Sequence, residues 1–159
     1  FSNYSKNTKR NLDTNLNASL YVNTIIDAKV FLNFFKKYIN HKANLTIRDY
    51  SIVYNLIQVC MKKKIGFLYG VYDSQNNLLG CAFFIYFLKR HILLFNASNH
   101  KSNHSIMTYL IDNYIKDNCL KDEVLDFEGS NIEGVKRFYK GFGSLEKNYI
   151  YIKKNRYFF

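Results

Sequence analysis

Residues 64–98 constrain the fold more than any other part of the chain, because three strand-like runs follow one another there with very short connections. The runs are rich in aromatic and β-branched residues and read "KIGFLYGVYD" (64–73), "LLGCAFFIYFLKR" (78–90) and "HILLFNAS" (91–98). The first two are separated by "SQNN", whose asparagines tolerate the left-handed backbone of a hairpin turn. Strands joined by such short turns pair antiparallel. The sequence therefore predicts three consecutive antiparallel strands.

Three segments outside these strands show the apolar spacing of helices. Asp27 is expected to cap the first, and Thr46 with Asp49 resembles a capping box at the start of the second, which runs to about Lys62. The third covers 105–118. Inward-facing residues are expected to be Val30, Phe31, Phe34, Phe35 and Tyr38 in the first helix, Ile52, Val53, Leu56, Ile57, Val59 and Cys60 in the second, and Ile106, Met107, Leu110, Ile111, Tyr114 and Ile115 in the third.

The remaining segments complete an alternating pattern of helices and strands. Residues 1–18 have weak helical character, "SLYVNTII" (19–26), "EVLDFEGS" (123–130) and "NYIYIKK" (148–154) are typical of strands, and "NIEGVKRFYKGF" (131–142) is typical of a helix with Ile132, Val135, Phe138 and Phe142 inward. The order α-β-α-α-β-β-β-α-β-α-β predicts an α/β (α+β mixed) fold. It would have a central mixed sheet, antiparallel strands first, and helices on both faces. No repeat or linker interrupts the chain, so we expect one domain over residues 1–159.

The composition says more about the kind of binding partner than about the fold. Apolar residues make up 48% and charged residues 22% of the chain, which excludes disordered and fibrous classes. No apolar run approaches the roughly 18 residues that a membrane-spanning helix needs. A net charge of +11 favours anionic partners such as RNA, nucleotide cofactors or phospholipid surfaces, or else belongs to a solvated basic surface. The spacing of Cys60, Cys81 and Cys119 fits neither a disulfide framework nor a zinc site, and predicts reduced thiols in a cytoplasmic protein.

Three stretches resemble a known superfamily. "SKNTKRNL" (5–12), "LDFEGS" (125–130) and "RFYKGFG" (137–143), in this order on these elements, are similar to motifs of the GNAT N-acyltransferases, and more closely to their Fem-like branch. In the third stretch Tyr139 stands where the Fem motif has a lysine. The resemblance implies an acyl-CoA N-acyltransferase fold, acyl transfer to a small-molecule amine, and a chain that is the C-terminal half of a longer two-domain protein.

The resemblance also places an acyl donor in the loop before residue 105. In GNAT enzymes a glycine-rich turn holds the pyrophosphate of coenzyme A at a helix N-terminus, where orphan backbone N–H groups attract phosphate. Here the loop reads "SNHKSNHS" (98–105) and has no glycine. It could therefore be a plain polar N-cap, or bind acetyl-CoA, another acyl-CoA or a different phosphate-bearing ligand. The candidate donor-binding residues are Ser98, Asn99, Lys101, Asn103, His104 and Ser105.

Three residues of the last third are candidates for catalysis. The resemblance gives Tyr139 the task of protonating the leaving thiolate, which suits a phenol; otherwise Tyr139 is a core aromatic. Asp126 and Glu128 are expected on one face of a strand, where either could hold the incoming amine or take its proton. Alternatively, the two carboxylates have a structural role and interact favourably with the N-terminus of the next helix.

Two other activities stay open beside the acyltransferase. One is a Fem-like peptidyltransferase that uses aminoacyl-tRNA, with Lys6, Lys9 and Arg10 binding the tRNA. The other is a degenerate, non-catalytic half whose aromatic end, Tyr157–Phe159, packs against a missing N-terminal half or a second copy in a homo-dimer. No metal site is expected, because His100 and His104 have no third ligand nearby.

Overall fold

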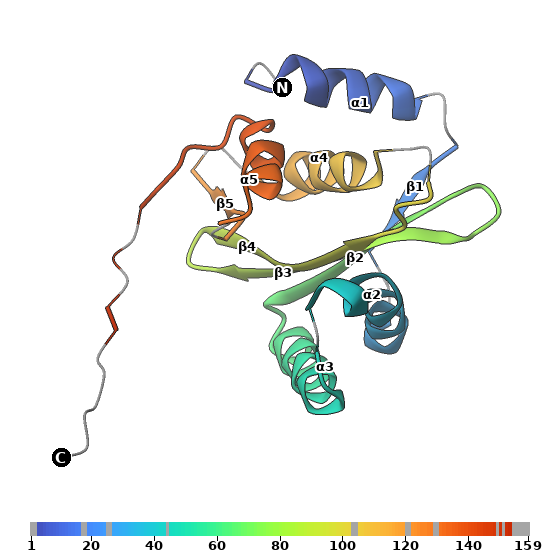
Figure 1. Cartoon of the computed structure of the whole chain (residues 1–159), viewed down its shortest axis with the longest axis vertical. Helices are drawn as coiled ribbons and strands as arrows, with labels where there is room; N and C mark the ends of the chain where they lie inside the picture. Colours follow the sequence, from blue (N-terminus) through green and yellow to red (C-terminus); the bar gives the residue numbers. More distant parts are fainter. Residues whose placement is uncertain are drawn as a thin grey trace.

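The structure is a computed structural model and shows one sheet with helices on both faces (Figure 1). It describes residues 3–16, 19–24, 27–43, 45–102, 105–119, 122–128, 131–148, 150 and 152–153. In Figure 1, α2 and α3 lie on one face of the sheet, and α1, α4 and α5 lie on the other. No described helix is both long enough and apolar enough to cross a bilayer.

The sheet has the predicted mixed topology. β2 (Gly66–Tyr72), β3 (Leu78–Phe87) and β4 (Arg90–Ser98) form the antiparallel series expected from their short connections. A short β1 (Tyr21–Asn23) pairs antiparallel with β2. β5 (Val124–Asp126) pairs parallel with the start of β4, so the strand order is β1-β2-β3-β4-β5.

Two helices cover the first face, and both begin as their local sequence predicts. In α2 (Ala28–Ala43) the Asp27 carboxylate accepts the Lys29 N–H at 2.6 Å. In α3 (Ile47–Lys62) the capping box of Thr46 and Asp49 is confirmed in both directions. Their buried side chains form one core layer with the sheet, which includes Phe31, Phe34, Phe35, Tyr50, Val53, Ile57, Leu68, Cys81 and Phe83.

On the second face, α4 (Ile106–Asn118) packs on the sheet and α1 (Lys6–Leu16) lies across α4 (Figure 1). α5 (Glu133–Lys140) completes this layer. Its core includes Tyr4, Leu12, Tyr69, Val71, Phe84, Leu93, Leu110, Ile111, Tyr114 and Phe142. α1 therefore contributes Leu12 to a core formed mainly by segments that are distant along the chain.

Several local expectations were wrong. The strand predicted at 19–26 is confirmed as β1, although the strand covers only Tyr21–Asn23. By contrast, the described residues of the predicted strand 148–154, which are 148, 150, 152 and 153, lie outside any strand. Two apolar side chains expected to be inward, on either side of the sheet, are exposed instead: Val30 and Ile132. The same holds for Ile52, Leu56 and Val59, which lie at helical spacing on a flank of α3 that faces neither the sheet nor α2. Each helix packs through a narrower stripe than its apolar content suggests.

Candidate functional site

The second half of β4 differs from the first because the sheet opens there. Phe83 pairs with Phe95 and Phe84 with Leu93, so Leu94 is an extra residue that forms a β-bulge. β5 pairs with β4 only as far as Ile92, whereas β4 continues to Ser98. Within the described residues, this half of β4 has a strand neighbour on the β3 side alone.

A polar hollow of about 340 Å³ lies where β4 ends and α4 begins. The end of β4 and the following loop line it through Ser98, Asn99 and Ser105, α1 contributes Asn11, and α5 contributes Phe138. The first three residues of α4 also line it, and their backbone N–H groups have no intrahelical acceptor. Partial positive charge from these amides faces the hollow, which makes it suitable for an anion.

The structure brings together part of the predicted donor-binding set. Ser98, Asn99 and Ser105 line the hollow, and Ser105 is the N-cap residue of α4 but makes no side-chain capping bond. Lys101 is exposed and outside the lining, and its backbone N–H donates to Asn99 Oδ1 at 3.0 Å. Asn103 and His104 lie outside the described residues.

Asn11 and Phe138 reach the hollow because α1 is fastened to both of the helices beside it. Thr8 Oγ1 donates to the Gly141 carbonyl at 2.9 Å at the end of α5, and Asn15 Nδ2 donates to the Ser105 carbonyl at 3.2 Å at the start of α4. A Cβ on Gly141 would lie 2.5 Å from Thr8 Oγ1, so only glycine permits this approach. The sequence analysis missed Asn11, since the weak apolar pattern of residues 1–18 indicates no partner.

Tyr139 lies on the same side of the sheet as the hollow. Its ring stacks on Phe127 with centroids 4.5 Å apart, and its hydroxyl is hydrogen-bonded to the Asn96 side chain. Asn96 and Ser98 are two residues apart on β4 and therefore share a face. Burial raises the pKa of Tyr139, and the hydrogen bond from Asn96 partly opposes that rise. The phenol is consequently neutral at physiological pH and can donate a proton.

Asp126 and Glu128 do not share a strand face as expected, because β5 ends at Asp126 and Glu128 has a left-handed backbone with φ of 59°. Asp126 accepts a charged hydrogen bond from Arg90 at 2.6 Å and accepts the Glu128 N–H at 2.9 Å. Since Leu125 packs in the α4-side core, Asp126 points to the opposite face of the sheet from Tyr139. Glu128 is exposed, two residues after the end of β5.

A second cluster of ionisable groups, which the sequence analysis missed, lies at the opposite end of β4. His91 is 5% exposed and contacts Tyr114 Oη through Nδ1 at 2.8 Å and Glu123 Oε2 through Nε2 at 3.2 Å. Tyr86 Oη donates to Glu123 Oε1 at 2.8 Å. This network connects β3, β4, α4 and the start of β5, and burial strongly raises the pKa of the Tyr114 phenol.

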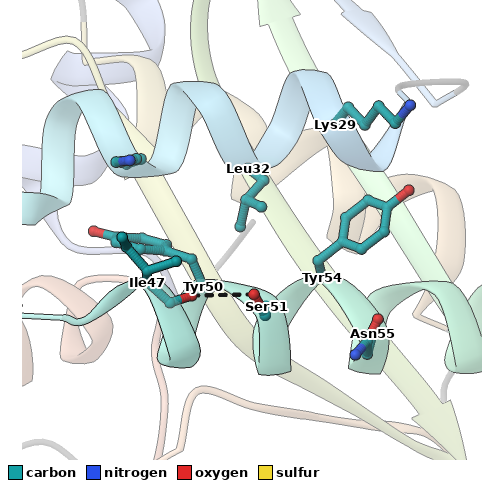
Figure 2. Close-up of a pocket in the computed structure, with 8 residues that line it drawn as sticks. Lys29, Leu32, Ile47, Tyr50, Ser51, Tyr54 and Asn55 are labelled. Carbon is teal, nitrogen blue, oxygen red and sulfur yellow. Dashed lines mark hydrogen bonds between the residues drawn. The ribbon is translucent and has the colours of Figure 1, made fainter.

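A larger hollow of about 520 Å³ lies on the other face of the protein, between α2 and α3. Figure 2 shows Leu32 projecting from α2 toward Tyr50 and Tyr54 on α3, with Lys29 at one end. None of the predicted site residues lines it. Among the described residues, no three His, Cys, Asp or Glu side chains are grouped as metal ligands would be.

Comparison with known proteins supports the fold. No family model matches the sequence, and no curated protein is similar to it in sequence. Solved structures do match. FemX has a TM-score of 0.69 at 12% identity, covering 89% of this chain and 54% of its own. A possible acetyltransferase from Clostridium difficile 630 has a TM-score of 0.66 at 11% identity, covering 86% of this chain and 97% of its own.

The aminoglycoside 6'-N-acetyltransferase AAC(6')-Ih from Acinetobacter baumannii has a TM-score of 0.61 at 10% identity, covering 86% of this chain and 99% of its own. The chain therefore has the fold of the GNAT acetyltransferases, including that of FemX, of which it spans about half the length. At these identities the likeness concerns the fold, and the chemistry has to be argued from the site.

Proposed function

We propose that the protein is an N-acyltransferase that moves an acyl group from a phosphate-bearing donor to an amine. The observation that carries this proposal is the position of the polar hollow. It lies where β4 ends and α4 begins, and Tyr139, the residue after Phe138 of its lining, is hydrogen-bonded to Asn96 on β4. A phosphate site and a proton donor on the same side of the sheet are what transfer from an acyl thioester requires.

The donor in this proposal is acetyl-CoA or another acyl-CoA. The hollow fits a diphosphate, because its walls are polar and the first amides of α4 face it. Ser98, Asn99 and Ser105 supply further hydrogen-bonding groups. Lys101, Asn103 and His104 belong to the same stretch of sequence, 98–105, and we assign them to the donor site as well. The loop has no glycine, so contact with phosphate here involves side chains more than in a glycine-rich turn.

The donor supplies the acyl group as a thioester, and the residues of this chain manage two protons. The amine nitrogen forms a bond to the acyl carbon while the bond from that carbon to sulfur breaks. Tyr139 donates its proton to the departing sulfur, a role that its raised pKa permits at neutral pH. Glu128 receives the proton that the amine loses. Asp126 is a positioning residue that holds Glu128 by accepting its backbone N–H.

A Fem-like reaction with aminoacyl-tRNA as donor is the second candidate. Two observations favour it, namely the similarity to FemX over 89% of this chain and the net charge of +11. In that case the chain is the C-terminal half of a longer protein and tRNA is its partner, bound by Lys6, Lys9 and Arg10 of α1, the helix that also carries Asn11 of the hollow. A third candidate, a non-catalytic half that completes a partner domain, is favoured by the absence of glycine in the loop.

Binding of acetyl-CoA and turnover test the proposal together. Saturating acetyl-CoA should raise the melting temperature, since a ligand at a hundredfold over its Kd adds about 2.7 kcal/mol. Tyr139→Phe should lower acetyl transfer to an aminoglycoside or a lysine peptide at least about tenfold while acetyl-CoA still binds. Tyr54→Phe, which lies in the hollow on the opposite face, is the matched control and should leave turnover unchanged.

The same measurements separate the three candidates. A flat response to acetyl-CoA, together with tRNA binding that weakens steeply with salt, would favour the aminoacyl-tRNA donor. No binding of either donor would reject a catalytic role for this chain alone. Equal turnover in Tyr139→Phe and the parent protein would remove Tyr139 from the mechanism.

A further inference from the structure

The turn between β3 and β4 exposes an apolar tip that the acyltransferase proposal does not use. Phe87 is 60% exposed and Leu88 is 81% exposed, and Lys89 and Arg90 follow them directly. Val124 at the start of β5 is also exposed, and its N–H donates to the Lys89 carbonyl, so it lies beside the tip. In Figure 1 this turn is at the left end of the sheet, at the same end as β5.

The backbone of this turn is unfavourable for the residues that occupy it. Phe87 pairs with Arg90, so the loop has two residues, and both Leu88 and Lys89 have positive φ, at 49° and 62°. Such a turn strongly prefers Asn and Gly, because a larger side chain crowds the backbone in the left-handed region. At the β2–β3 turn of the same sheet, the positive φ of 63° belongs to Asn76. A leucine that is both strained and exposed does little for folding, which points to a role in contact with something else.

A row of lysines lies next to the tip. Tyr86 N–H donates to the Ile65 carbonyl at 2.8 Å, which places the end of α3 and the residues after it beside Phe87. Lys62, Lys63 and Lys64 are all exposed there, and so is Lys89. None of these four lysines forms an ion pair with another described residue, whereas Arg90 is neutralised by Asp126.

We propose that this hairpin surface, formed by Phe87, Leu88, Lys89, Lys62–Lys64 and Val124, docks on an anionic phospholipid bilayer. The apolar tip would enter the boundary between headgroups and acyl chains, and the lysines would contact lipid phosphates with their stems along the apolar surface. Leu88, the most exposed side chain of the tip, can neither stack on a base nor form a hydrogen bond, which disfavours nucleic acid as the occupant. An unpaired cationic rim around an aliphatic tip complements an anionic membrane surface.

The proposed surface and the polar hollow lie at opposite ends of one strand. β4 runs from Arg90 at the hairpin to Ser98 at the hollow, and eight steps of about 3.3 Å put the two ends roughly 26 Å apart. Docking through the hairpin would leave the hollow open to its ligand. The inference does not depend on the proposed acyltransferase activity, because no residue of the hairpin surface lines the hollow.

Flotation with lipid vesicles tests the proposal directly. The protein should float with vesicles of phosphatidylcholine and phosphatidylglycerol but not with vesicles of phosphatidylcholine alone, and added salt should weaken the binding. Leu88→Asn should lower the vesicle partition coefficient at least about tenfold, because one buried leucine side chain is lost from the membrane. Replacing Lys62, Lys63 and Lys64 by Gln should also lower it.

Matched controls come from elsewhere on the chain. Leu145 is 94% exposed and has no positive φ, so Leu145→Asn removes another highly exposed leucine outside the hairpin surface and should leave flotation unchanged. Replacing Lys6 and Lys9 of α1 by Gln removes positive charge outside the hairpin surface and should also leave flotation unchanged. Failure of the parent protein to float with anionic vesicles would overturn the proposal. An equal loss of vesicle binding in Leu88→Asn and Leu145→Asn would overturn it too. If the parent protein self-associates but does not bind vesicles, and Leu88→Asn abolishes the self-association, the surface is instead a contact between copies of the chain.

Discussion

Replacing the β3–β4 turn by a sequence that suits its backbone should stabilise the protein. The double change Leu88→Asn with Lys89→Gly places Asn-Gly, the preferred pair of this turn type, at two positions whose φ values are 49° and 62°. A left-handed backbone costs an ordinary residue roughly 1–2 kcal/mol, and both Asn and Gly avoid much of that cost. Leu88 is 81% exposed, so the leucine contributes little burial that could be lost.

The magnitude follows from these opposing effects. Relief of strain at two positions is worth about 2 kcal/mol together. Loss of the roughly one-fifth of the leucine that is buried costs about 0.4 kcal/mol. The greater freedom of glycine in the unfolded chain costs about 0.5–1 kcal/mol. We expect a net gain of about 1 kcal/mol, or a rise in melting temperature of about 2–4 °C for a domain of this size.

Urea unfolding followed by circular dichroism, with a parallel thermal scan, measures the change. The urea midpoint should rise while the slope of unfolding free energy against urea stays the same, because the surface exposed on unfolding is nearly unchanged. Leu145→Asn is the control and should leave the midpoint where it is, since Leu145 has no positive φ. An unchanged or lower midpoint in the double variant would refute the strain argument. Stability that rises while vesicle binding falls would show that the chain keeps this turn for contact and not for folding.

Two further predictions concern buried and capping groups. Tyr114→Phe should destabilise the fold by about 1–3 kcal/mol in urea unfolding, because it leaves the buried Nδ1 of His91 without its partner; a loss below about 0.5 kcal/mol would mean that the network carries little stability. Asp49 has a pKa lowered by its hydrogen bonds from the side chain and backbone of Thr46, so its ionised form is favoured in the folded state. The stability it adds is present above the ordinary carboxyl pKa and is lost as pH falls through the lower, folded value. Asp49→Asn should therefore unfold with less loss of stability between pH ~6 and pH ~3 than the parent protein, and parallel pH profiles would contradict the role of this cap.

Local signals were sufficient for much of the fold. The short connections after β2 and β3 left these strands no pairing other than antiparallel, and the side chains of Asp27 and Thr46 start α2 and α3 through bonds to residues two or three positions away. The amphipathic period of α4 is likewise a property of its own residues. The motifs near Tyr139 indicated the superfamily fold that the solved structures share, although sequence comparison alone finds no relative.

Long-range packing decided the rest. The hollow takes its walls from α1, the end of β4 and α5, which meet through bonds such as Thr8 to Gly141 and Asn15 to Ser105, across 133 and 90 residues of chain. The contacts of His91 and the exposure of one flank of α3 also depend on which other elements pack beside them. The residue pattern within a single element does not contain that information. A periodic sequence states that a helix has an apolar face, whereas the width of the face that is buried depends on its partners. For this protein, the elements and their order follow from the sequence, and the site exists only where distant elements meet.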